Sequence, residues 1–184
     1  MSVDGPLYFA YGSNMLTERL QARVPSARPV GTATLPGHAL RFRKQSTDGS
    51  AKCTVVSTSP SSCSRWPSPV VGVCFQMNDA HLPALDAAEG RGQGYTREKL
   101  DVDREGSCVP AFAYVAQDSH VNPDLHPYAW YKALVMAGAR QHDLPPPTST
   151  GSVPSTPFAT PTRIGARRTS RSCGKPASPN GFSI

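Results

Sequence analysis

Residues 8–14 read Tyr-Phe-Ala-Tyr-Gly-Ser-Asn, and they determine how the chain begins to fold. The apolar and aromatic run from Leu7 to Tyr11 predicts a strand, and the Gly-Ser-Asn that follows predicts a tight turn. From Met15 to Arg23 the apolar residues recur at helical spacing, and Ser13 or Asn14 is a natural N-cap for that helix. The segment therefore predicts a strand, a glycine turn and a helix in succession.

The turn at Gly12-Ser13-Asn14 has the features of an anion site. Gly12 allows a ligand to approach the backbone, and the N–H groups and dipole at the start of a helix attract a carboxylate or phosphate. Ser13 and Asn14 add side-chain donors. The alternative is an ordinary strand-to-helix turn with a capping residue. A serine hydrolase is a further alternative for Ser13, although the G-x-S-x-G frame of a nucleophile elbow is missing.

The rest of the chain predicts mainly strands, with helices between only some of them. The expected strands are 28–45 and 51–57, broken by turns at 36–37 and 48–49, followed by 70–77, 95–103 and 109–116. The expected helices are 78–89, with Leu82, Leu85 and Ala88 on one face, and 129–141. Because most strands follow one another directly, we expect an α+β fold with a mixed, mostly antiparallel sheet.

Glu89 is the candidate acid–base residue. It ends the helix 78–89, where the negative end of the helix dipole disfavours the charged carboxylate, so we expect a raised pKa suited to general acid–base chemistry. The alternative is a solvated glutamate at a frayed helix end. Asp86, three residues earlier, is expected to be a surface or structural residue rather than a second member of the site.

Three tyrosines and a glycine-rich loop complete the set of candidates. Tyr95, Tyr114 and Tyr131 each offer a hydroxyl to a pocket, or else lie half-buried in the core. The loop Gly90–Gly94 follows a helix and precedes a strand, which is the reverse of the order in dinucleotide-binding motifs, so we do not interpret it as a phosphate loop. It is expected to let Glu89 and Tyr95 approach one pocket.

The positive charge of the chain lies near its C-terminal end. The formal net charge is +6, but residues 145–184 carry +5 of it and residues 1–144 only +1. Residues 145–184 are rich in Pro, Ser, Thr and Arg, and we predict a disordered tail, because such a segment buries too little apolar surface to order itself. An out-of-frame reading of the gene is the alternative, which resequencing of the 3′ end would test. Residues 1–144 form the predicted domain.

Several classes of protein are excluded by composition. No apolar run approaches the length of a membrane span, and the N-terminus lacks the features of a secretory signal. The five cysteines form no C-x-x-C pair and have no histidine at ligand spacing, which argues against a disulfide framework and a zinc site. We therefore expect a soluble cytoplasmic protein with reduced thiols and no nucleic-acid or membrane partner.

Taken together, these motifs resemble the γ-glutamylcyclotransferase (AIG2-like) family. The resemblance rests on Tyr8-Phe-Ala-Tyr-Gly-Ser-Asn-Met15 with a downstream Leu85-Asp-x-x-Glu-Gly90 and Tyr95, and it extends over about residues 7–145. Ala111-Phe-Ala-Tyr114 and the late Trp130-Tyr-Lys132 fit the same pattern. The resemblance implies a compact β-barrel-like α+β fold with flanking helices, whose active site lies at the end of the barrel.

The activity implied by the resemblance is cyclisation of a γ-glutamyl group to 5-oxoproline, with release of the amine to which it was attached. Glu89 falls on the family's acid–base glutamate. The implied substrate-binding residues are Tyr8, Phe9, Ala10, Tyr11, Gly12, Ser13, Asn14, Tyr95, Tyr114 and Tyr131. The implied partner is a small γ-glutamyl amino acid, peptide or amine, no cofactor or metal is required, and the protein is expected to be a monomer or homodimer.

An alternative from another functional class is a non-catalytic binding protein of the same fold, whose basic tail holds an anionic partner. Glu89 discriminates between the two, because a protein that only binds has no need of a carboxylate at that helix end.

Overall fold

A computed structural model describes residues 5–58 and 69–145. The chain divides into two units, residues 1–148 and residues 149–184. The predicted tail lies outside the described residues except for Pro145. The described residues therefore all belong to the first unit.

A closed barrel of five strands forms the centre of this unit, with the strand order β1–β5–β2–β6–β7. Its strands are β1 (Leu7–Ala10), β2 (Arg28–Leu35), β5 (Val70–Gln76), β6 (Tyr95–Arg104) and β7 (Ser107–Ala116). The pairs β1–β5, β2–β5, β2–β6 and β6–β7 are antiparallel. Only the seam, where Tyr8 of β1 lies opposite Phe112 of β7, is parallel. The prediction of a mostly antiparallel, barrel-like α+β fold is confirmed.

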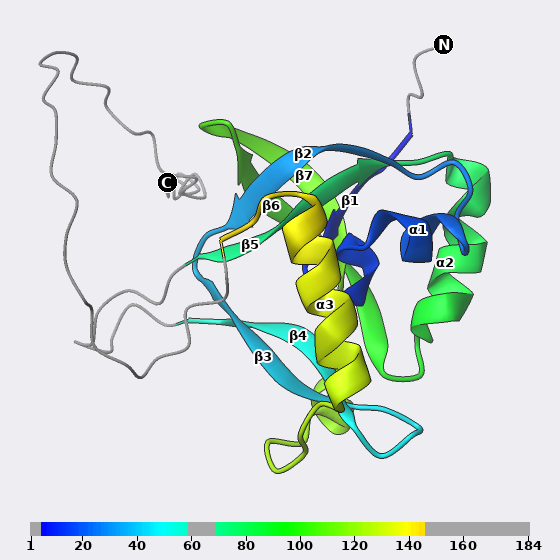
Figure 1. The fold of residues 1–184 in the computed structure, drawn as a ribbon, viewed down its shortest axis with the longest axis vertical. Coiled ribbons are helices and arrows are strands. Elements are labelled where there is room, and N and C mark those ends of the chain that lie inside the picture. Colours follow the sequence, from blue (N-terminus) through cyan, green and yellow to red (C-terminus); the bar gives the residue numbers. More distant parts are fainter. Residues whose placement is uncertain (1–4, 59–68, 146–184) are drawn as a thin grey trace, which may run out of the picture. The chain divides into compact units, whose positions relative to one another are not determined.

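A second sheet of two antiparallel strands lies beside the barrel, below it in Figure 1. It consists of β3 (His38–Gln45) and β4 (Ala51–Ser57). Its register shifts between Phe42 and Lys44, which brings Lys44 directly opposite Lys52. The buried hydroxyl of Thr54 accepts a hydrogen bond from the N–H of Ala116, which ties this sheet to β7.

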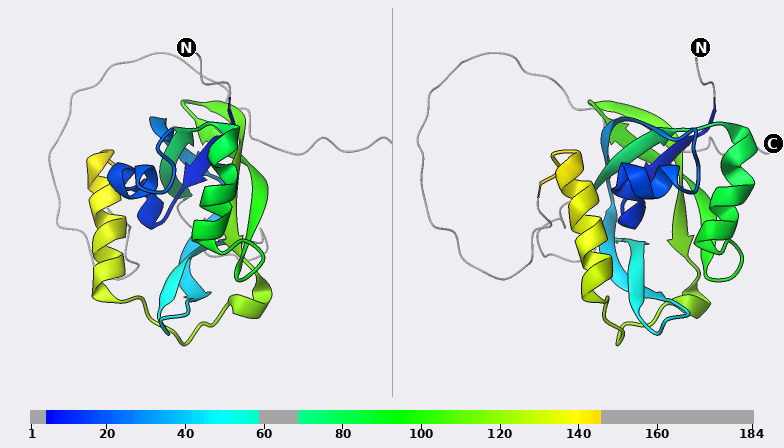
Figure 2. Two further views of the ribbon diagram at one scale, coloured as in Figure 1. Left: turned by 90° about the vertical axis from the view of Figure 1, so that its right-hand side faces the viewer. Right: turned by 45° about the vertical axis from the view of Figure 1, so that its right-hand side comes forward.

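The helices lie around the barrel, as the three views of Figures 1 and 2 show. They are the 3-10 turns η1 (Ser13–Met15), η2 (Asp79–His81) and η3 (Asp118–His120), and the helices α1 (Thr17–Gln21), α2 (Leu82–Glu89) and α3 (Ala129–Gln141). Gly90 ends α2 in the left-handed conformation, with φ 64°. A left-handed glycine is the commonest way to end a helix.

Two local predictions about the helices are wrong. The continuous helix expected from Met15 is instead the turn η1 followed by the five-residue α1, because Leu16 between them is extended (φ −70°, ψ 111°). Neither Ser13 nor Asn14 caps either segment. In α2 only Leu85 is fully buried, whereas Ala88 is exposed. This short helix therefore packs against the barrel mainly through the turn that contains Leu85, and not along a continuous apolar face.

The core fills the barrel and the space beneath the helices. Phe9 and Phe75 inside the sheet, and Leu20 and Leu85 from the two short helices, are completely buried. No helix among the described residues is long and apolar enough to cross a membrane.

Candidate active site

A small pocket, with a cavity volume of about 30 Å³, lies where β1, η1 and α2 meet β4, β6, β7 and α3. It is lined by Tyr8, Tyr11, Gly12, Ser13, Asn14, Cys53, Glu89, Tyr95, Tyr114 and Tyr131. The structure therefore brings together the predicted acid–base residue, most of the predicted loop and all three predicted tyrosines. Phe9 and Ala10 do not line the pocket, because their side chains are buried in the core.

Glu89 is held by two donors on one carboxylate oxygen. Its Oε1 accepts hydrogen bonds from Asn14 Nδ2 at 2.9 Å and from Arg23 Nη1 at 2.8 Å. The Glu89 side chain is 16% exposed.

Asn14 connects this carboxylate to the rest of the pocket. Its Nδ2 donates both to Glu89 and to the Tyr8 hydroxyl, at 3.1 Å, while its Oδ1 accepts from Arg23 at 3.0 Å. Asn14 is almost completely buried. Its side chain is thus occupied in orienting Glu89 and Tyr8, which explains why it does not cap the following helix.

Asp86 proves to be an anchor for a pocket tyrosine. The Tyr114 hydroxyl donates to Asp86 Oδ1 at 2.6 Å, and Arg91 and Arg97 lie within 2.9 Å and 3.3 Å of Oδ2. The hydroxyl of Tyr11 in turn donates to the backbone carbonyl of Tyr114. This matches the structural role expected of Asp86, and it fixes one wall of the pocket.

On the opposite wall of the pocket, two tyrosine hydroxyl groups form hydrogen bonds with the backbone of Cys53. The Tyr95 hydroxyl donates to the carbonyl of Cys53 at 2.7 Å, and the Tyr131 hydroxyl accepts from its N–H at 3.1 Å. Burial raises the pKa of both tyrosines, and it raises the pKa of the Cys53 thiol to about 12. Cys53 is therefore a neutral thiol at physiological pH and is not suited to act as a nucleophile.

The turn η1 presents its backbone to the same pocket. The turn's own hydrogen bonds begin with the N–H of Met15, which donates to the carbonyl of Gly12 at 3.0 Å. The N–H groups of Ser13 and Asn14 come before Met15 in the turn. The first N–H groups of a helical turn have no acceptor within that turn. A Cβ on Gly12 would lie 3.2 Å from the Tyr131 hydroxyl, so the glycine keeps this part of the pocket open.

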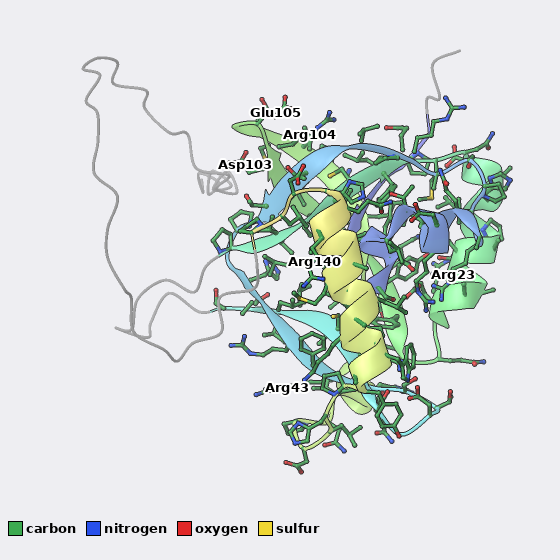
Figure 3. The ribbon with its side chains drawn as sticks, viewed as in Figure 1. Arg23, Arg43, Asp103, Arg104, Glu105 and Arg140 are labelled. Atoms are coloured by element: carbon green, nitrogen blue, oxygen red, sulfur yellow. The ribbon has the colours of Figure 1, made fainter. Side chains whose placement is uncertain are left out.

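Two residues of this arrangement, Cys53 and Arg23, were not among the residues predicted from the sequence. Cys53 carries no motif and reaches the pocket only because β4 passes beneath the barrel end. Arg23 follows α1 and lies where α1 and α2 face each other (Figure 3). An arginine at that position gives no signal in the sequence, since its partner Glu89 is 66 residues away.

The thiols and acids suggest no metal centre in the part of the chain that the structure describes. No group of three or more His, Cys, Asp or Glu side chains there is placed to hold an ion. Cys53 and Cys74 are free and buried.

Comparison with known proteins places the pocket in a family context. The family model described as "Gamma-glutamyl cyclotransferase, AIG2-like" matches residues 8–133, which include every pocket residue. The chain belongs to this γ-glutamyl cyclotransferase family. The human γ-glutamylcyclotransferase is 33% identical over 154 residues, covering 78% of this chain and 77% of that protein. The bovine γ-glutamylcyclotransferase is 34% identical over 152 residues, covering 78% and 76%.

Solved structures agree with this membership of the γ-glutamyl cyclotransferase family. A structure titled γ-glutamyl cyclotransferase superposes with a TM-score of 0.65 and 29% identity, covering 81% of this chain and 93% of the other. The closed barrel and its flanking helices are thus those of the cyclotransferase family.

Proposed function

We propose that this protein converts a γ-glutamyl amino acid, peptide or amine to 5-oxoproline and the free amine, with Glu89 as the general acid and base. The observation that carries the proposal is the position of Glu89. A carboxylate with a fixed orientation lines a pocket whose other lining groups are neutral or are backbone amides.

In the proposed reaction the nucleophile belongs to the substrate. Glu89 takes a proton from the α-ammonium group, and the resulting amine attacks the γ-carbonyl carbon to form the C–N bond of a five-membered ring. The bond to the leaving nitrogen then breaks as Glu89 returns a proton to it. In total the ring nitrogen loses two protons and the leaving nitrogen gains two, so Glu89 ends in its starting state.

The backbone of η1 supplies the other requirement, which is stabilisation of negative charge. The carbonyl oxygen becomes negative during attack, and N–H groups aimed at it stabilise the transition state. We assign this role, or binding of the substrate α-carboxylate, to the N–H groups of Ser13 and Asn14.

The pocket tyrosines are proposed to shape the site rather than to transfer protons. Burial raises the pKa of Tyr8, Tyr11, Tyr95, Tyr114 and Tyr131, so each remains a neutral hydroxyl at physiological pH. Neutral hydroxyls orient a ligand by hydrogen bonds. Holding the flexible γ-glutamyl chain in a ring-like geometry supplies an orientation effect of up to about 7–11 kcal/mol in favourable intramolecular cases.

The direct test is incubation with a panel of γ-glutamyl compounds and measurement of 5-oxoproline. We expect release from the wild type and a reduction in kcat of about 100- to 10,000-fold for Glu89→Gln, the range typical of general acid–base catalysis. Glu98→Gln, at an exposed position on β6, is the control and should match the wild type. If the wild type releases no 5-oxoproline from any donor, the non-catalytic binding protein becomes the better account.

The remaining expectations stand as part of this proposal: action in the cytoplasm, no cofactor, and a monomer or homodimer. Fractionation of cells and sedimentation of the purified chain would test the first and the last.

A further inference from the structure

Lys44 is a cation beside the site, and no salt bridge between described residues includes it. Its side chain leaves β3 half-buried, and its ammonium group lies 4.8 Å from the centre of the Tyr95 ring. In the part of the chain that the structure describes, no carboxylate or hydrogen-bond acceptor contacts this ammonium group. A Cβ on Gly94 would approach Lys44 Nζ to 2.9 Å, so this glycine makes room for the lysine at its position.

The neighbouring cations are already engaged. Lys52, directly across the two-stranded sheet, forms an ion pair with Asp48 at 2.8 Å. Arg23 is paired with Glu89, and Arg19 donates to the Ser13 hydroxyl at 3.2 Å. Like charges directly opposite each other on a sheet are unfavourable. The pairing of Lys44 with Lys52 therefore leaves an excess positive charge at Lys44.

The positive charge of Lys44 lies next to the pocket. Tyr95, on which Lys44 rests, is a pocket residue, and the electrostatic influence of Glu89 extends to the Lys44 ammonium. Burial lowers the pKa of Lys44, whereas Glu89 and Asp48 raise it and Lys52 lowers it further. An anion bound against Lys44 would offset both burial and the repulsion from Lys52.

We propose that Lys44 binds a carboxylate on the leaving amine and thereby makes the site selective for γ-glutamyl amino acids over γ-glutamyl amides that lack this charge. The inference rests on the proposed function, because it places the γ-glutamyl group in the pocket beside Glu89. The carboxylate carbon of an amino-acid leaving group lies about 4 Å from the reacting carbonyl carbon. The inference places this carboxylate outside the pocket, beside the Tyr95 ring, where the Lys44 ammonium group lies.

The test compares two substrates that differ only in charge, γ-glutamyl-alanine and γ-glutamyl-alaninamide. In Lys44→Met, which keeps the aliphatic stem, we expect the ratio of kcat/KM for the acid to that for the amide to fall by about 10- to 100-fold, the range for loss of a hydrogen bond between charged groups. Lys44→Arg should retain most of the selectivity. Lys132→Met, an exposed lysine on α3, is the control and should leave the ratio unchanged.

The ratio separates a contact with the leaving group from an indirect effect. If Lys44 acted only through its charge on Glu89, Lys44→Met would change both substrates alike and the ratio would stay constant. A constant ratio in an active enzyme would overturn the assignment of Lys44 and leave the proposed function intact.

A binding measurement distinguishes failure of the reaction from failure of this inference. Calorimetry on Glu89→Gln protein, with and without Lys44→Met, gives the affinity for both compounds without turnover. Tighter binding of the acid that disappears with Lys44→Met supports the inference even if the wild type releases no 5-oxoproline. Equal affinities for acid and amide in both proteins would overturn it.

Discussion

Asn14 shows how much of the site depends on one amide side chain. Its nitrogen donates to Glu89 and Tyr8 while its oxygen accepts from Arg23, so each end of the amide faces a partner of the matching kind. Exchange of the nitrogen for an oxygen would therefore reverse the interaction with Glu89 without changing the shape of the side chain.

Asn14→Asp tests this role. It places an oxygen 2.9 Å from Glu89 Oε1 in place of a donor, and we expect the free energy of unfolding to fall by about 1–3 kcal/mol, the range for an unsatisfied buried polar group. Chemical denaturation measures the loss. Asn122→Asp is the control, because the Asn122 Oδ1 accepts from the N–H of Asp124 and aspartate keeps that acceptor. Equal stabilities of the two variants would contradict the role assigned to Asn14.

Tyr95 gives a second prediction for a single residue. Tyr95→Phe removes the donor to the buried Cys53 carbonyl, and we expect a loss of about 1–3 kcal/mol in the free energy of unfolding. Tyr128→Phe is the matched control, since the Tyr128 hydroxyl also donates to a backbone carbonyl, that of Asp48, but its side chain is 47% exposed. Water can replace that bond, so the control should lose less than about 0.5 kcal/mol. Denaturant unfolding of both proteins measures the difference.

Helix α3 is positioned by a glycine. A Cβ on Gly138 would lie 2.4 Å from the backbone nitrogen of Leu16 and 2.7 Å from the carbonyl carbon of Met15. Helix propensity alone predicts that alanine would stabilise this position by about 1 kcal/mol. Contact with a backbone that cannot move away predicts the opposite result. The glycine thus allows α3 to pack directly against the turn that lines the pocket.

We therefore expect Gly138→Ala to lower the free energy of unfolding by about 1–3 kcal/mol, as overpacked positions do, and to reduce activity by displacing η1. Thermal unfolding and the 5-oxoproline assay measure the two effects. Ala133→Gly, at an exposed position on the same helix, is the comparison, and should cost about 1 kcal/mol without affecting activity. A more stable Gly138→Ala protein would contradict the packing described above.

At the level of elements, local patterns predicted most of the strands and helices. The turns at residues 36–37 and 48–49 separate strands as expected, because glycine there adopts a positive φ that few other residues tolerate. The break at Leu16 was not predictable, because the apolar residues keep their helical spacing across it. The pairing of β1 with β7, and the arrival of Arg23 and Cys53 at the pocket, follow from tertiary packing.

For the whole molecule, the buried hydroxyl and thiol groups predict loss of stability at alkaline pH. Burial raises the pKa of five of the six tyrosines above 10, and that of Cys53 from 9.0 to about 12. The unfolded chain therefore releases these protons at lower pH than the folded protein does. Their contribution to stability is complete below about pH 9 and is lost as the pH rises above it.

The slope of this loss approaches about 1.4 kcal/mol per pH unit for each group that ionises only in the unfolded chain. We expect the melting temperature to fall continuously from pH 9 to pH 11, and tyrosinate absorbance to rise together with unfolding. Cys53→Ala removes one such group, so between pH 9 and pH 10 its stability should fall less steeply than that of the wild type. A melting temperature constant over this range would contradict the burial of these groups.

The parallel seam between β1 and β7 has a consequence for biosynthesis. About 100 residues separate the two strands in the chain, and translation at about 5–20 residues per second delays their meeting by about 5–20 seconds. During that interval the apolar strand Leu7–Ala10 has an open edge, and such edges pair readily with other chains. Tyr131 is synthesised later still, so the pocket is completed after the barrel has closed. A newly made chain thus passes through its most aggregation-prone stage before it acquires a site that a ligand could stabilise.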